Sequence, residues 1–244
     1  MKSRAPWMLC SLSFALAASP ALADDRDDSD AEYSDEGSDT SERGGGFALG
    51  LRAGFGVPFG KISGDEAQED RSKLADAFSG AIPFQVEAGY FFNPNVYLGA
   101  FFQYGILTLK PDCLEGVSCS ASQLRVGINA AYHFQATRLL EPWVGLGVGY
   151  ERSSQTSSLE RSEDEVSATV SIQGLEFVSG QAGLDFRVSR RFSVGPYVTY
   201  TLAQYSSVTL TNTRGDAQIG ETEDIDEKAL HSWLYGGVRL QMRF

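Results

Sequence analysis

The chain has 244 residues and a formal net charge of −12 at pH 7, from 32 acidic and 20 basic side chains. An acidic balance of this kind is unsuited to a nucleic-acid partner, whose backbone is also negative. After the N-terminal region there is no apolar run long enough for a transmembrane helix, so any membrane crossing would have to be made by strands closed on themselves. The 26 glycines, 15 phenylalanines and 10 tyrosines suit such a barrel, apolar outside and polar inside.

Residues 1–23 have the three parts of a secretory signal peptide. Lys2 and Arg4 supply the positive start, Trp7 to Ala18 form a short apolar stretch, and Ala21-Leu22-Ala23 fits the small-residue cleavage site. A membrane-anchoring helix needs about 20 apolar residues, and this stretch is shorter. We therefore expect cleavage after Ala23 and export of the chain.

Residues 24–46 form a separate acidic segment. It reads DDRDDSDAEYSDEGSDTSERGGG, with ten acidic side chains and almost nothing apolar to bury. Such a composition predicts a disordered tail. A calcium-binding loop is the alternative, but Asp30 stands where the turn of that loop needs glycine. We expect no metal site here.

Residues 47–244 alternate between apolar and polar side chains with a period of two, which is typical of strands with two different faces. Within the last of these segments, for example, Leu234, Val238 and Leu240 alternate with Tyr235, Arg239 and Gln241. The alternation of the sixth segment shifts phase near Val178-Ser179-Gly180, which indicates a β-bulge or a strand that extends beyond a membrane. Eight such segments are predicted: Phe47–Phe59, Ile82–Phe92, Val96–Leu109, Leu124–Gln135, Pro142–Glu151, Val170–Val188, Phe192–Gln204 and Trp233–Phe244.

The connections between these segments alternate in length. The connections Asn93–Asn95, Ala136–Glu141 and Ser189–Arg191 are short, whereas the intervening ones are long and polar. In bacterial outer-membrane barrels the short turns face the periplasm and the long loops face outward. We therefore expect both termini on the periplasmic side. The long segments Lys61–Ser79, Lys110–Ser122, Glu160–Glu165 and Ser206–Ala229 are predicted to be exposed loops.

The chain resembles the small outer-membrane β-barrel family that includes the OmpA transmembrane domain and OmpX. Eight alternating segments, the rhythm of the loops and the terminal sequence RLQMRF carry this resemblance over residues 47–244. It implies an all-β, eight-stranded antiparallel up-and-down transmembrane barrel in the bacterial outer membrane. It also implies contact with lipid and lipopolysaccharide, and an assembly signal at Leu240, Met242 and Phe244 for the barrel assembly machinery.

Several polar residues fall on the inner face near mid-height of their segments. An eight-stranded barrel is just wide enough inside for side chains to fill it, so buried charges there need partners. We expect a plug in which Glu87 lies between Arg52 and Arg239, with glycines making room. Gln103 and Asn129 belong to the same predicted lumen network.

The close pair Cys113 and Cys119 lies in one loop and predicts a disulfide in an oxidising compartment. A zinc site would need further ligands, and no cluster of suitable spacing accompanies the pair. The sequence indicates no cofactor.

The two histidines raise the alternative of a lipid A-modifying enzyme. Such a site needs a histidine, a serine and an acidic residue on one lipid-facing side. Gln135 follows His133 at the offset where a serine would be needed, and His231 and Ser232 are adjacent and so point to opposite faces. The sequence favours a non-enzymatic, monomeric barrel acting in surface interaction or envelope integrity. A narrow channel for small solutes or ions is the alternative.

Overall fold

The computed structural model describes residues 45–64, 73–110, 113, 116–135, 137, 139–161, 164–214 and 217–244. The predicted signal peptide and almost all of the predicted acidic tail lie outside these residues. Within them, no helix is long and apolar enough to cross a membrane.

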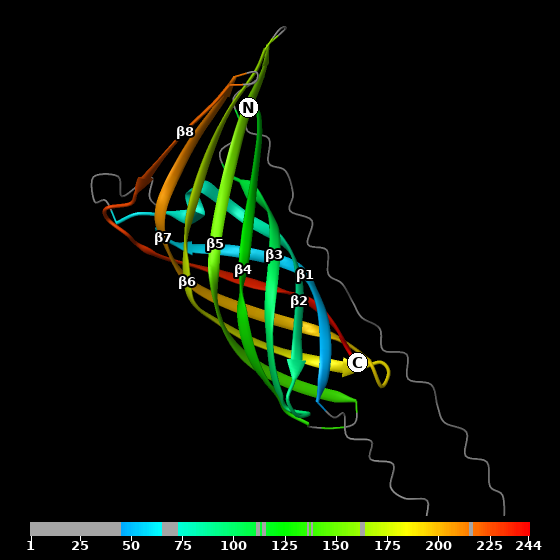
Figure 1. The fold of residues 1–244 in the computed structure, drawn as a ribbon. Helices are drawn as coiled ribbons and strands as arrows, with labels where there is room; N and C mark the ends of the chain where they lie inside the picture. The colour runs from blue at the N-terminus through cyan, green and yellow to red at the C-terminus, as the bar shows by residue number, and fades with distance from the viewer. Residues whose placement is uncertain are drawn as a thin grey trace, which may run out of the picture. The chain divides into compact units, whose positions relative to one another are not determined.

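The described chain forms an antiparallel barrel of eight strands with one additional strand, β8, on its edge (Figure 1). Each strand from β1 to β7 pairs with the next one along the chain. β9 pairs with β7 on one side and with β1 on the other, which closes the barrel. The predicted eight-stranded barrel is confirmed. The elements are β1 Gly46–Gly60, α1 Leu74–Ala77, β2 Phe78–Phe91, β3 Val96–Leu109, β4 Ser118–His133, β5 Leu140–Arg161, β6 Asp164–Arg187, β7 Phe192–Arg214, β8 Ala217–Asp224 and β9 Leu230–Arg243.

The outer wall of the barrel is an apolar band that every barrel strand shares. Large apolar side chains face outward on each of these strands, as the alternation predicts, and Leu146 on β5 is 64% exposed. A folded water-soluble protein would bury side chains of this size, so the band requires an apolar environment. Others are Leu49, Val86, Phe102, Ile128, Val198 and Leu240, all exposed, and Leu184, which is partly exposed.

The strands on one side of the barrel are longer than predicted. In Figure 1, β5, β6 and β7 continue beyond the barrel, and β8 pairs with the outer part of β7. The expectation of a loop at Ser206–Ala229 is therefore wrong for most of its length, and β4 already begins at Ser118 inside the expected loop Lys110–Ser122. Serine and threonine are frequent in these extensions. The sequence there does not alternate between apolar and polar residues, so the alternation did not predict these strands. We name the outer parts of β4 to β8 the extension sheet.

The predicted phase shift in the sixth segment is a β-bulge. The pairing of β6 with β7 shifts between Glu176 and Val178, so that Phe177 is the extra residue of β6. A second shift lies opposite residues 173 and 174, where Ser206 is the extra residue of β7. Each bulge exchanges the two faces of its own strand beyond that point.

The long segment Lys61–Ser79 is only partly an exposed loop. Its single described helical turn, α1, buries Leu74 completely, and Phe78 at the start of β2 is 4% exposed. The prediction of full exposure is wrong here, because these two apolar side chains join the cluster of buried apolar residues. The predicted loop Glu160–Glu165 is wrong for most of its length, because β5 continues to Arg161 and β6 begins at Asp164; the side chains of this segment lie outside the described ones. The predicted disulfide between Cys113 and Cys119 is present, with Cα atoms 6.2 Å apart.

Candidate functional site

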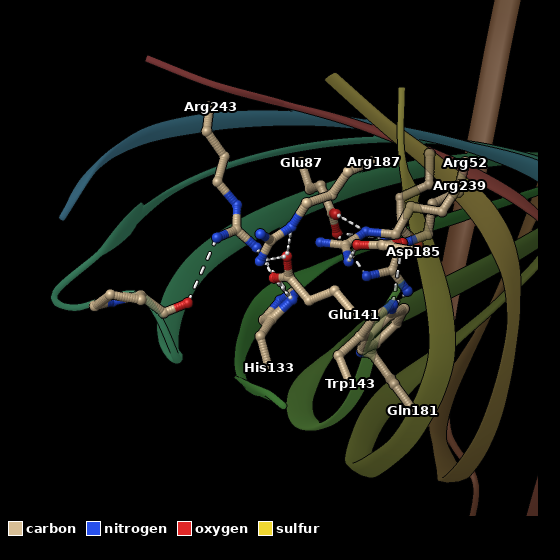
Figure 2. A network of polar contacts seen from close by, with 12 residues as sticks. Arg52, Glu87, His133, Glu141, Trp143, Gln181, Asp185, Arg187, Arg239 and Arg243 are labelled. Carbon is tan, nitrogen blue, oxygen red and sulfur yellow. Dashed lines mark hydrogen bonds and ion pairs between the residues drawn. The ribbon is translucent and has the colours of Figure 1, made fainter. Parts of the chain in front are cut away.

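The barrel interior holds many buried polar side chains, and those at its middle are organised around Glu87 on β2. One carboxylate oxygen of Glu87 accepts a hydrogen bond from Arg52 Nη2 at 2.8 Å, and the other accepts one from Arg239 Nε at 2.9 Å (Figure 2). The arginines come from β1 and β9, which become neighbours only when the barrel closes. Arg52 and Arg239 are directly paired positions in that closure.

A second carboxylate balances the second arginine. Asp185 on β6 accepts from Arg239 Nη1 at 3.1 Å and from the indole nitrogen of Trp143 at 3.2 Å. The Arg239 guanidinium lies over the Trp143 ring, 4.4 Å from its centroid. We name Arg52, Glu87, Trp143, Asp185 and Arg239 the central cluster. Two full positive charges meet two full negative charges in it, which is how buried charges are tolerated.

A further group lies near the short turns, and we name it the turn-end cluster. His133 Nδ1 and Arg187 Nη2 lie 2.8 Å from different oxygens of Glu141, and Arg243 also bonds this carboxylate (Figure 2). The Arg243 guanidinium covers the ring of Phe91, 3.6 Å from its centroid. These side chains fill the interior at the end where the short turns lie.

The opposite end is filled by what we name the loop-end cluster. Arg125 on β4 donates to Glu176 at 2.8 Å and to Gln103 at 2.8 Å. Glu151 accepts from Gln123 at 3.1 Å and from the Tyr205 hydroxyl at 2.6 Å. The ring of Tyr205 stacks on His231 at 3.8 Å between centroids, and the Tyr235 hydroxyl donates to Gln123 at 2.8 Å.

Glycines leave the space that these side chains occupy. Gly50 on β1 is the paired position of Glu87, and a Cβ at Gly50 would overlap the Glu87 side chain. A Cβ at Gly183 would come within 2.6 Å of the Trp143 ring. Glycine in these inner positions therefore permits the large side chains opposite.

The structure brings together only some of the side chains that the sequence assigned to the lumen network. Arg52, Glu87 and Arg239 are in contact, as described above. Gln103 bonds Arg125 instead, and Asn129 is buried at 3% exposure with no partner found for its Oδ1 among the described residues.

Sequence reasoning missed most of the acidic side chains of these clusters. They are Glu141, Glu151, Glu176 and Asp185, all buried. Their inward parity was readable for three of them, but Glu176 lies beyond the bulge at Phe177, where the parity of β6 is reversed.

The interior position of both histidines bears on the enzyme alternative. His133 and His231 are fully buried inside the barrel and do not face the apolar outer wall. A lipid-modifying site of the type considered from the sequence would need its histidine on that wall. In the described part of the chain, no three His, Cys, Asp or Glu side chains are arranged to hold a metal ion.

No protein-family model matches the chain, and no curated protein matches it. Several solved structures are similar in fold. Neisserial surface protein A is 14% identical, with 82% of this chain and 99% of that chain covered and a TM-score of 0.48. The outer membrane protein OprG from Pseudomonas aeruginosa is 14% identical, with coverage of 82% and 97% and a TM-score of 0.45. The outer membrane protease OmpT from Escherichia coli is 9% identical, with coverage of 84% and 98% and a TM-score of 0.38. A shared barrel does not imply a shared activity.

Proposed function

We propose that the chain is a non-enzymatic barrel of the bacterial outer membrane that does not conduct, and that its extension sheet and loops act in surface interaction or envelope integrity. The apolar band supports the membrane location, because exposed side chains such as Leu146 and Phe102 are unfavourable in water and favourable in contact with lipid acyl chains. The lack of a lipid-facing histidine among the described residues supports a role without catalysis.

One observation carries the proposal of a closed interior. The charged side chains of the central cluster are each at most 4% exposed, and the clusters on either side of it are also buried except for Arg187, which is partly exposed. Water or solute would have to separate the ion pairs of Glu87 and Asp185 to pass. Separating such pairs leaves buried charges without partners, which costs several kcal/mol.

The orientation is part of the proposal. The turns at Asn93–Asn95 and Ser189–Arg191 are short, whereas β5, β6 and β7 extend far at the other end. Long strands and loops belong to the cell surface in barrels of this kind. The termini then lie in the periplasm. Leu240 and Met242, on the strand that closes the barrel, and Phe244 directly after it form the signal for the barrel assembly machinery.

Planar bilayer recordings of the refolded full chain test the proposal directly. We expect bilayers to take up the protein without steady single-channel conductance steps. Uniform, reproducible steps would contradict the closed interior and would establish the alternative of a narrow channel. Failure of the refolded barrel to insert into lipid bilayers would contradict the membrane location.

A further inference from the structure

The extension sheet carries rows of hydroxyl side chains on one face. Residues that pair directly across antiparallel strands share a face, as do alternate residues along each strand. The pairings of β4 through β8 therefore place serines and threonines side by side in three successive rows. The rows are Ser122, Ser154, Ser171, Thr209 and Thr222; Ser120, Thr156, Thr169 and Thr211; and Ser118, Ser158, Ser167 and Thr213.

The contacts between side chains confirm this shared face. The hydroxyls of Ser154 and Ser171 are 2.8 Å apart, and those of Thr156 and Thr169 are 3.0 Å apart. Each hydroxyl both donates and accepts, so these bonds use only part of its capacity. The rows thus present a regular set of donors and acceptors, with strands about 4.8 Å apart and rows about 6.7 Å apart. Ser171 is the exception, because it is buried at 3% exposure and bonds both Ser154 and Arg152.

This face continues the lipid-facing wall of the barrel. Along β5 the outward side chains run from Leu146 through Tyr150 and Arg152 to Ser154. Leu146 and Tyr150 belong to the apolar band, and the hydroxyl rows begin directly beyond Arg152. In the orientation of the proposed function, the rows stand at the height where the acyl chains of the outer leaflet end and the headgroups begin.

Composition distinguishes the hydroxyl rows from an ordinary solvated face. The three rows hold no charged side chain among their described residues, although the chain as a whole carries a net charge of −12. Serine is also not among the residues with a high intrinsic propensity for strands. The exposed Arg152, which donates to Ser171 at 3.2 Å, lies in the next row toward the barrel, with Asp224 at the far edge of that row on β8.

The opposite face of the same strands is different. Val170, Leu210 and Ile219 lie on it with 41%, 48% and 75% of their surface exposed. That face turns toward the axis of the barrel rather than to the surrounding membrane, because it continues the inner wall. Only the hydroxyl face is both polar and directed outward.

We infer that the hydroxyl rows form a docking surface for the sugar headgroups of an outer-leaflet glycolipid, with Arg152 facing the phosphate groups nearest the acyl chains. This inference rests on the proposed membrane location and orientation. A saccharide offers many hydroxyl donors and acceptors without charge, which matches the rows. A neutral face also avoids the repulsion that this acidic chain would otherwise exert on an anionic headgroup layer.

The test uses the full chain, refolded in a zwitterionic detergent and titrated with deep-rough lipopolysaccharide, which has lipid A and only the innermost sugars. Phosphatidylglycerol serves as the anionic lipid without sugar. Thr156→Val, Thr169→Val and Thr211→Val are combined in one variant, because valine keeps the shape and strand preference of threonine and replaces only the hydroxyl, by a methyl group. The control combines Ser157→Ala with Asn212→Ala at the same height on the opposite face.

We expect the triple variant to bind deep-rough lipopolysaccharide about tenfold more weakly or worse, from the loss of three hydrogen-bonding groups. The control should bind like the wild type, and phosphatidylglycerol should not discriminate between the proteins. Equal affinity of the triple variant and the wild type would overturn the inference, as would an equal loss toward phosphatidylglycerol.

Two further measurements keep the outcomes distinct. Insertion of the wild type into lipid vesicles tests the proposed function alone, so an inserted barrel with unaltered affinity in the triple variant refutes only the docking surface. If the triple variant does not give the folded band on an unboiled gel, Ser154→Ala combined with Ser158→Ala takes its place. A several-fold loss is then expected, and an unchanged affinity refutes the inference.

Discussion

At the scale of single residues, the interior is governed by the cost of burying charge. Glu87 has a side chain with no exposed surface, and it is compatible with that position because two guanidinium groups reach it from β1 and β9. A buried ion pair adds little compared with an apolar replacement of the whole pair, but removing one partner is costly. Glu87 therefore matters for stability because its removal would leave buried arginines with too little counter-charge.

Glu87→Ala should destabilise the folded barrel by about 3 to 5 kcal/mol, because Arg52 would lose the carboxylate that it contacts and Arg239 would keep its contact with Asp185 alone. The temperature at which the folded band disappears from an unboiled gel measures this effect, and planar bilayers report any leak. Glu87→Gln is the matched variant: it keeps the shape and loses the charge, so it should also be destabilised, but less. An unchanged transition temperature and unchanged conductance in Glu87→Ala would show that this network does not hold the interior closed.

Gly50→Ala should be destabilised by about 1 to 3 kcal/mol, the usual cost of overpacking. The new methyl group would overlap the Glu87 side chain and displace its carboxylate from the arginines. Gly180→Ala is the control, because a Cβ at Gly180 meets nothing within 4 Å. The same gel assay compares the two, and similar stability of both variants would argue against close packing at Gly50.

At the scale of the strand, one element passes through two environments. The alternation of apolar residues located the barrel part of β5 from the sequence, since Val144, Leu146 and Val148 all face outward. The sequence did not predict residues 152–161 as strand, because a polar face and a mixed face give no period of two in hydrophobicity. Cross-strand pairing with β6, a tertiary contact, determines that these residues continue the strand.

An arginine placed on β5 should distinguish these environments. Leu146→Arg puts a charge in the apolar band and should reduce stability in lipid by about 2 to 4 kcal/mol. Ser158→Arg lies on the same strand and the same face beyond the band, and it should cost almost nothing. Urea-dependent folding into phospholipid vesicles measures both. Equal losses in the two variants would contradict the assigned limit of the apolar band.

At the scale of the whole molecule, the number of barrel strands, the closure and the inward position of Arg52 and Glu87 followed from the sequence. The acidic partners of the other clusters did not, because their contacts join residues far apart in the chain: Arg125 and Glu176 are 51 positions apart. Which inward residues meet depends on the register and tilt of the closed barrel. Neither can be read from one strand.

The burial of the ion pairs predicts a weak salt dependence for the molecule as a whole. At about 0.1 M salt, interactions between exposed charges more than about 10 Å apart are largely screened, whereas buried ion pairs are screened much less. The gel transition temperature should therefore change by only a few degrees between about 0.1 M and about 1 M NaCl. A steep decrease over this range would mean that water and ions enter the interior, contrary to the closed barrel.

The two bulges determine which residues of the extension sheet face outward. Phe177 in β6 and Ser206 in β7 each add one residue, and every side chain beyond them trades places between the faces. If β6 and β7 alternated strictly through residues 177 and 206 instead of forming the two bulges, Thr169 and Thr211 would turn toward the axis, and Val170 and Leu210 would turn outward. Deletion of Phe177 or Ser206 would therefore leave the faces of the tip in place, whereas deletion of one residue between a bulge and the tip would exchange the two faces on that strand, although the residues of the tip would stay the same.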